Sequence, residues 1–389
     1  METPVVGIVG AGQLARMMQQ AAIGLDIPLR LLAEAKDSSA AHVIPDTTVG
    51  DYTDYDTLAP WAKSNTVVTF DHEHVSTAHL EALVADGVTV RPAPGALVHA
   101  QDKCVMRARL LSLGVPGPRH AVVVTADDVA GFAATAGGFP LVLKTARGGY
   151  DGKGVFVVED EAGAAGVLAS TPEQVGILAE EKVDFRRELA ALVARAPSGQ
   201  LAAYPVVESV QRDGICIEVT APAPDLDPGL AVEAQRIAMR VAAKLDVTGL
   251  FVVELFETSD GRVLVNELAM RPHNTGHWSI DGAVTSQFEN HLRAVLDLPL
   301  GDPTARARWS VMVNILGGSA PTLYDGYPHV QARDPRVRVH LYGKQVKPGR
   351  KVGHVTAYGE DLEDVRERAR HAAAWFEGRI NDEAADEES

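Results

Sequence analysis

Residues 139–160 read FPLVLKTARGGYDGKGVFVVED, and this stretch decides the fold. An apolar run on each side predicts two strands, and the glycines between them predict a flexible turn. The turn joins strand to strand, and no Ser or Thr follows Lys153, so it is not the GxxxxGK[ST] loop that leads into a helix. We expect the loop to fold over phosphate oxygens, with Lys144 on the preceding strand as a second positive charge. An exposed hairpin turn is the alternative, but it needs fewer than the four glycines Gly148, Gly149, Gly152 and Gly154.

Upstream of this hairpin, residues 1–98 predict a Rossmann-like, doubly wound parallel sheet. VVGIVGAG at 5–12 is typical of a buried strand that runs into a glycine turn, and helical spacing of apolar residues follows it. Further strands are expected at 29–34 and 65–70. Strands that alternate with helices favour a parallel sheet.

The glycine turn after the first strand leaves three interpretations open. Gly7, Gly10 and Gly12 let a backbone approach a phosphate at a helix N-terminus, which we favour. Ala15 and Glu34 also fit a looser dinucleotide fingerprint, so NAD is a second interpretation. A tight packing turn is the third.

Downstream, residues 99–300 predict a mixed α/β domain. Helices are expected at 101–114 and 231–245, and strands at 177–184, 188–195 and 202–210. The segments 250–258 and 262–270 predict a hairpin around Ser-Asp-Gly. Residues 301–378 predict a small C-terminal domain of short strands with a helix near 361–376, and residues 379–389 an acidic, disordered tail.

The hairpin carries two carboxylates, Glu254 and Glu267, inside apolar runs. Two neighbouring carboxylates repel each other unless a cation joins them. Mg²⁺ bound to nucleotide phosphates takes hard oxygen ligands of this kind, and Asn266 completes the set. We therefore expect Mg²⁺, or Mn²⁺ in its place; the alternative is a pair of edge-strand glutamates that face solvent.

Two further segments favour anion binding. In RPHNTGHW (271–278), Arg271 suits a planar carbonate or phosphate, and His273 and Asn274 are placed to orient it. Zinc on His273 and His277 is the alternative, but no cysteine lies nearby in the sequence. In the later segment YGKQVKPGRKVGH, four cations predict a phosphate site rather than a solvated basic loop: Lys344, Lys347, Arg350 and Lys351.

Composition excludes several classes of function. The 389 residues are 46% hydrophobic and 23% charged, which indicates globular domains with real cores. The net charge of −16 argues against nucleic-acid binding, and no apolar run is long enough for a membrane span. Cys104 and Cys216 suit a reducing, cytoplasmic compartment.

Taken in order, KTARGGYDGKGV, FVVELF, VNELAMRPHNTGHW and KPGRKVGH resemble the ATP-grasp enzymes, and within them the N5-carboxyaminoimidazole ribonucleotide synthetases. GIVGAGQLARM (7–17) resembles that family's GGGQLGRM start, and TFDHEHV (69–75) its TYExEN segment. The resemblance covers about residues 5–358. It implies a pre-ATP-grasp substrate domain, a two-lobed ATP-grasp domain and a small β-rich C-terminal domain.

The resemblance also implies roles for individual residues. Those expected to bind ATP are Lys103, Lys144, Gly149, Tyr150, Asp151, Gly152, Lys153, Gly154, Val155, Glu180, Glu181, Lys182, Val183, Glu188, Gln211, Asn266 and Glu267. Those expected at aminoimidazole ribonucleotide or bicarbonate are Gln13, Leu14, Glu73, Tyr150, Asp151, Arg271, His273, Asn274, Lys344, Arg350 and Lys351. Catalysis is expected of Arg271, His273, Asn274, Tyr150 and Asp151, and Mg²⁺ binding of Glu254 and Glu267.

The sequence departs from the family pattern at a few positions. Lys103 stands where the family carries lysine or arginine, so its phosphate contact is kept. Glu208 and Gln211 stand where some relatives carry histidine, which leaves the nucleotide contact of Gln211 open. Ala15 replaces a glycine and Met270 a proline. None of these changes removes a group that the chemistry needs.

The activity implied is that of a carbon–nitrogen ligase of purine synthesis, in which ATP and bicarbonate carboxylate aminoimidazole ribonucleotide through carboxyphosphate. A homodimer that hands its product to a mutase is also implied. Rivals are a glycinamide ribonucleotide transformylase, a biotin carboxylase, a dinucleotide-dependent dehydrogenase and a regulatory nucleotide-binding module. The dehydrogenase leaves the second glycine loop and the two glutamates unexplained.

Overall fold

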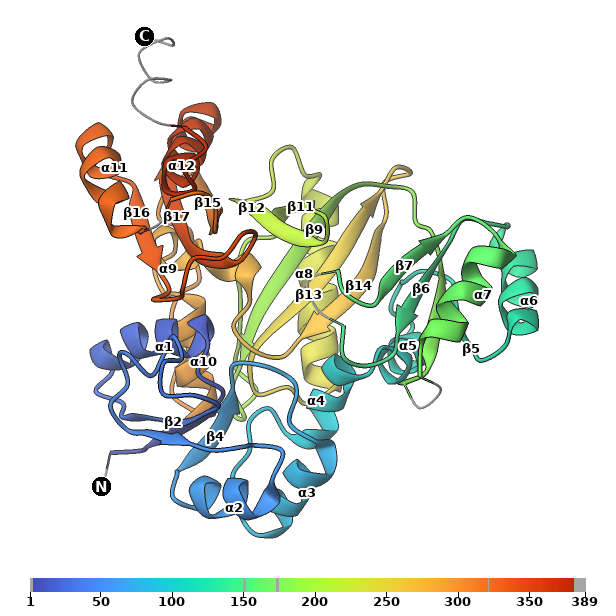
Figure 1. Cartoon of the computed structure of the whole chain (residues 1–389), viewed down its shortest axis with the longest axis horizontal. Coiled ribbons are helices and arrows are strands. Elements are labelled where there is room, and N and C mark those ends of the chain that lie inside the picture. The colour runs from blue at the N-terminus through green and yellow to red at the C-terminus, as the bar shows by residue number, and fades with distance from the viewer. Residues whose placement is uncertain (1–2, 150–151, 173–174, 321, 381–389) are drawn as a thin grey trace.

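The computed structural model describes residues 3–149, 152–172, 175–320 and 322–380, and its strands form three sheets (Figure 1). The N-terminal sheet is parallel, in the order β3 (Thr47–Val49), β2 (Leu29–Ala33), β1 (Val6–Val9) and β4 (Val67–Phe70). Its helices are α1 (Gln13–Gly24), α2 (Tyr55–Lys63), α3 (Thr77–Ala85) and α4 (Pro94–Gln101). The predicted parallel sheet is confirmed.

The second sheet belongs to a small antiparallel lobe, drawn in teal and green in Figure 1. Its order is β5 (His120–Val123), β8 (Ile177–Glu181), β6 (Leu141–Thr145) and β7 (Val155–Val158). Strands β6 and β7 pair from Leu141↔Val158 to Lys144↔Val155, so the hairpin predicted around the glycine loop is confirmed. Helices α6 (Ala126–Ala136) and α7 (Glu161–Ser170) pack on this sheet through an apolar core, and α5 (Lys103–Ser112) precedes it.

The third sheet has nine strands and runs from the central lobe into the C-terminal segment. Its order is β14 (Val263–Ala269), β13 (Gly249–Thr258), β9 (Phe185–Arg195), β11 (Val207–Arg212), β12 (Ile215–Ala221), β15 (Trp309–Leu316), β17 (Lys351–Gly359) and β16 (Arg338–Leu341), with β10 (Leu201–Ala203) beside β9. The single strand expected at 202–210 is therefore wrong: β10 and β11 are separate and pair with different stretches of β9. The break lets Tyr204 enter the core, where its hydroxyl donates to the carbonyl of Thr285.

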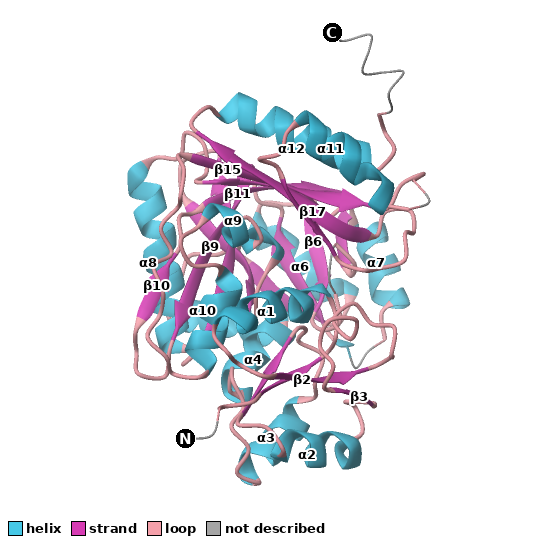
Figure 2. Cartoon of the chain, turned by 90° about the vertical axis from the view of Figure 1, so that its left-hand side faces the viewer, coloured by secondary structure: helices cyan, strands magenta, loops and turns pink. Residues whose placement is uncertain are grey.

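The remaining α-helices lie around this sheet, and one of them, α10, also contacts the N-terminal unit (Figure 2). They are α8 (Pro228–Lys244), α9 (Ser279–Gly282), α10 (Gln287–Val295), α11 (Tyr327–Arg333) and α12 (Leu362–Phe376). Helix α8 packs on β9 and β13 through alanine, valine and isoleucine side chains, as its apolar spacing requires. Helix α10 contacts α1, so the N-terminal sheet is fixed against the central lobe.

No helix among the described residues is long and apolar enough to cross a membrane.

Candidate active site

A cavity of about 960 Å³ lies where the N-terminal unit, the small lobe and the central sheet meet. Loops after β1 and β4 form one wall, and β13 and β14 form another. The sequence-predicted residues that line it are Gln13, Leu14, Glu73, Lys103, Lys144, Gly149, Gly152, Val155, Glu180, Glu181, Lys182, Val183, Glu188, Gln211, Glu254, Asn266, Glu267, Arg271, His273, Asn274 and Lys351. One cavity therefore unites side chains from nearly the whole length of the chain.

Tyr150 and Asp151 lie outside the described residues. Among the described residues, the predicted Lys153, Gly154, Lys344, Lys347 and Arg350 do not line the cavity. Lys344 is nevertheless close to it, since its ammonium donates to the Gln13 side chain from 331 positions away in sequence.

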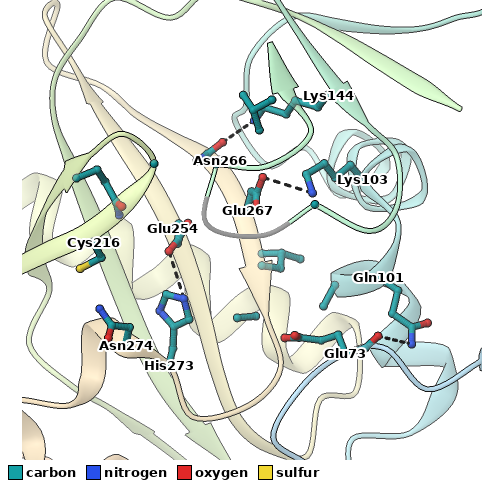
Figure 3. Close-up of a pocket in the computed structure, with 18 of the residues that line it drawn as sticks. Glu73, Gln101, Lys103, Lys144, Cys216, Glu254, Asn266, Glu267, His273 and Asn274 are labelled. Carbon is teal, nitrogen blue, oxygen red and sulfur yellow. Dashed lines mark hydrogen bonds and ion pairs between the residues drawn. The ribbon is translucent and has the colours of Figure 1, made fainter. Parts of the chain in front are cut away.

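Glu254 and Glu267 face each other across the β13–β14 hairpin as register partners, and a bulge follows Glu254 (Figure 3). Burial, together with the charges of Glu267 and Glu188, raises the pKa of Glu254 to about 8. Lys103 Nζ lies 3.6 Å from Glu267 Oε1. Paired carboxylates whose charge is this costly are suited to a divalent cation.

The donor set of the hairpin fits Mg²⁺ in a particular way. Among the described residues, no cluster of three or more His, Cys, Asp or Glu side chains could hold a metal by itself. Mg²⁺ commonly takes one or two carboxylates and completes its shell with substrate phosphates and water. Glu254 and Glu267 would therefore hold Mg²⁺ together with a nucleotide rather than alone.

Binding of Mg·ADP at pH 7 is expected to release a proton from Glu254, because the cation must displace it from a carboxyl with a pKa of about 8. Calorimetric titrations with preformed Mg·ADP, in buffers of different ionisation enthalpy, would show a buffer-dependent heat at pH 7. The dependence should vanish near pH 9.5, where Glu254 is already ionised. A heat at pH 7 that does not change with buffer would contradict the assignment.

The Lys144 ammonium is held in a buried ion network next to these carboxylates. It lies 2.9 Å from Glu180 Oε2 and 2.9 Å from Asn266 Oδ1, and the Arg107 guanidinium binds the other Glu180 oxygen. Burial alone would raise the pKa of Glu180, but Lys144 and Arg107 outweigh burial and hold that pKa below its usual range. Glu180 therefore fixes the position of the Lys144 charge.

Arg107 was missed by the sequence analysis. Its side chain is buried and also donates to the carbonyls of Val265 and Asn266, which ties α5 to the strand that carries Glu267. The available signal was spacing, since Arg107 follows Lys103 by one helical turn and so shares its helix face.

Arg271 follows β14 and lies against the loop after β4. Its Nε donates to Glu73 Oε2 at 2.8 Å, which joins the central lobe to the N-terminal unit. His273 Nε2 lies 3.4 Å from Glu254 Oε1. Burial and the nearby charges of Arg271 and Lys351 lower the pKa of His273 to about 3, so this imidazole is neutral at physiological pH.

Asn274 lies beside His273 on the cavity wall (Figure 3). Its buried amide lies against the Cys216 thiol, which is a weak partner, and its polar atoms make no other side-chain hydrogen bond with the residues that the structure describes. Such atoms are costly to bury and generally await a ligand or water. Asn274 is therefore available to a polar substrate.

The N-terminal glycine turn is filled by a side chain that the sequence analysis missed, Asp71. Its carboxylate accepts the amide N–H of Gly12, and a Cβ on Gly10 would collide with it. Burial raises the pKa of Asp71 to about 6. Gly10 thus has a packing role, and the close backbone approach that a dinucleotide needs there is already taken, while Gly12 and the N-terminus of α1 still line the cavity.

Three family models match consecutive parts of the chain: a ribonucleotide synthetase preATP-grasp domain over residues 1–101, an ATP-grasp domain over 108–288, and a phosphoribosylaminoimidazole carboxylase C-terminal domain over 310–368. The chain is 54% identical over 384 residues to N5-carboxyaminoimidazole ribonucleotide synthase of Mycobacterium tuberculosis, covering 97% of this chain and 89% of the relative. It is 50% identical to the enzyme of that name from Corynebacterium ammoniagenes, covering 95% and 91%.

Solved structures agree with these matches. A crystal structure of the ADP complex of N5-carboxyaminoimidazole ribonucleotide synthetase superposes with a TM-score of 0.88 at 32% identity, covering 96% of this chain and 97% of that one. The Aspergillus clavatus synthase in complex with ADP and 5-aminoimidazole ribonucleotide gives a TM-score of 0.87 at 32% identity, covering 97% and 99%. The chain belongs to the N5-carboxyaminoimidazole ribonucleotide synthase family and is an ATP-grasp ligase.

Proposed function

We propose that this ligase carboxylates 5-aminoimidazole ribonucleotide with bicarbonate and ATP in de novo purine synthesis, giving N5-carboxyaminoimidazole ribonucleotide, ADP and phosphate. The observation that carries the proposal is that one cavity contains both the Glu73–Arg271 pair and the Lys144–Glu254–Glu267 group. The first is suited to a polar substrate held by the N-terminal unit, and the second to a metal-bound triphosphate. The related Aspergillus clavatus structure contains ADP and 5-aminoimidazole ribonucleotide together.

On the nucleotide side, Lys144 and Lys103 supply positive charge to phosphate oxygens, and Glu180 and Glu267 orient the two ammonium groups. Mg²⁺ held by Glu254 and Glu267 would neutralise charge on the transferring phosphoryl group. The glycine loop is the proposed lid over the phosphates, and its described residues Gly149 and Gly152 line the cavity. The roles in binding and catalysis expected of Tyr150 and Asp151, which belong to this loop, are also part of the proposal.

On the acceptor side, we propose that a bicarbonate oxygen attacks the γ-phosphorus, ADP leaves, and carboxyphosphate forms beside Arg271 and Asn274. Carboxyphosphate then breaks into carbon dioxide and phosphate. The exocyclic amine attacks carbon dioxide, forms the new C–N bond and loses a proton. Phosphate is the favoured acceptor of that proton, because His273, with a pKa of about 3, is a weak base. Exclusion of water protects carboxyphosphate from hydrolysis.

The proposed 5′-phosphate site lies between the α1 N-terminus and the basic loop. Lys351 and Gln13 line the cavity, and Lys344 donates to Gln13. Backbone amides at a helix N-terminus and ammonium groups together favour a phosphate. Arg350 lies in the same loop outside the cavity lining, so its proposed contact requires the loop to move.

The test is ADP release from Mg·ATP and bicarbonate, with and without aminoimidazole ribonucleotide. Release that needs the ribonucleotide would support both the ligase and its substrate. Release that needs glycinamide ribonucleotide or biotin instead would keep the ATP-grasp chemistry and reject the substrate. Light scattering of the purified protein tests the proposed homodimer in the same preparation.

A further inference from the structure

Gln101, at the C-terminal end of α4, holds the loop that carries Glu73 (Figure 3). Its Nε2 donates to the carbonyls of Glu73 at 2.9 Å and Val75 at 2.7 Å. Its Oε1 accepts the Thr77 hydroxyl at 2.9 Å. One amide therefore binds two carbonyls of the loop and the first residue of α3, all within five consecutive residues.

The loop needs this support because none of its residues, 71–76, belongs to a helix or strand. It runs between β4 and α3, and Val75 is its anchor in the apolar core. The Glu73 side chain leaves the loop in the direction of the cavity and meets Arg271. A carbonyl held at Glu73 itself limits how far that carboxylate can move away from Arg271.

The two residues after Gln101 make contacts on the nucleotide side. Asp102 accepts Arg147 Nε at 2.8 Å, directly before the glycine loop, and caps α5 through the amides of Cys104 and Val105. Lys103 donates its amide to the Ala146 carbonyl at 2.9 Å, and its ammonium faces Glu267. The consecutive residues Gln101, Asp102 and Lys103 thus support opposite sides of the cavity. Gln101 holds the Glu73 loop, and Asp102 and Lys103 contact the nucleotide side.

We propose that Gln101 is a positioning residue for the second substrate: its amide fixes the Glu73 loop so that Glu73 and Arg271 are presented together to the ribonucleotide. Gln101 does not need to touch the substrate for this role. The proposal rests on the proposed function, because it takes aminoimidazole ribonucleotide as the ligand of Glu73 and Arg271. Asp102 serves the nucleotide loop in the same way, so neighbouring substitutions should affect different substrates.

The test compares Gln101→Glu with Asp102→Asn, both close in size to the native residue. Gln101→Glu replaces the Nε2 donor with an oxygen that faces two carbonyls, so the KM for aminoimidazole ribonucleotide should rise at least about tenfold. The KM for ATP should stay within about twofold. Asp102→Asn keeps the cap and weakens the contact to Arg147, so it should raise the KM for ATP instead. Gln20→Glu, the same change on an exposed position of α1, should change neither constant.

Each outcome has a distinct meaning. Equal rises in both KM values for Gln101→Glu, or no rise in either, would overturn the positioning role. A lowered melting temperature together with parallel losses in kcat and both KM values would identify a merely structural role. Calorimetric titration of the folded Gln101→Glu variant with aminoimidazole ribonucleotide measures binding without turnover and so repeats the test. If the wild-type protein shows no dependence on aminoimidazole ribonucleotide, the proposed function fails, and that failure is seen before any variant is compared.

Discussion

Arg271→Ala is expected to lower kcat/KM for aminoimidazole ribonucleotide by about 10³-fold. The substitution removes the planar guanidinium proposed to hold the reacting carboxyl group, an effect typical of losing one preorganised donor. It also leaves the Glu73 carboxylate without its partner at 2.8 Å. Arg271→Lys keeps the charge but not the planar pair of N–H donors, so its kcat/KM should fall less than that of Arg271→Ala. Steady-state assays of ADP and of carboxylated product measure both effects.

Arg262→Ala is a suitable control for Arg271→Ala. Arg262 is an exposed arginine at the turn of the same hairpin, and it pairs with Asp260 outside the cavity. Its loss should leave the kinetic constants within about twofold, since exposed ion pairs contribute little. Full turnover in Arg271→Ala would remove Arg271 from the proposed mechanism.

The features predicted well from the sequence are those with short-range causes. Glu254 and Glu267 face each other because a short turn sets the register of one hairpin, and both strands were visible as apolar runs. The β6–β7 hairpin around the glycine loop has the same origin. The parallel N-terminal sheet followed from the alternation of strands and helices.

The features that could not be predicted depend on contacts between distant parts of the chain. Asp71 fills the turn at Gly10 across 59 positions from Gly12, and its sequence neighbours do not reveal this. Arg107 and Glu180 form a buried pair across 73 positions. Pairing of β12 with β15 continues the central sheet into the C-terminal segment, which local hydrophobic patterns cannot show.

Gln101 shows the same limit within the cavity. It borders a predicted nucleotide ligand, Lys103, yet its side chain serves the loop of Glu73 on the opposite wall. A glutamine at a helix end has no sequence signal for this role, because the partners are backbone carbonyls of another segment. Prediction of supporting residues therefore requires the packed structure.

Glu254→Gln and Glu267→Gln are each expected to lower kcat by about 10³-fold or more, and Glu254→Gln should also make the metal-free protein more stable at high pH. Activity falls because a neutral amide is a poor Mg²⁺ ligand, and charge neutralisation at the transferring phosphoryl group is lost. Stability rises because the substitution removes a charge that is costly to bury and that is repelled by the Glu267 carboxylate opposite it in the hairpin. Function and stability should thus change in opposite directions, as is common at sites built to bind a ligand.

The gain in stability should depend on pH. The folded-state pKa of Glu254, about 8, lies above the value near 4.5 of an unfolded glutamate, so the wild type loses stability as pH rises through this window. Glu254→Gln escapes that loss, and its advantage should grow by about 4 kcal/mol between pH 5 and pH 9, since each unit of pKa shift corresponds to about 1.4 kcal/mol. Denaturant unfolding without metal, at several pH values, measures the difference. Glu257→Gln is the matched contrast: Glu257 is bound by Arg187, so removing its charge should destabilise the protein. A constant difference between Glu254→Gln and wild type across this range would show that folding does not raise the pKa of Glu254, and would weaken the case for a cation at this carboxylate.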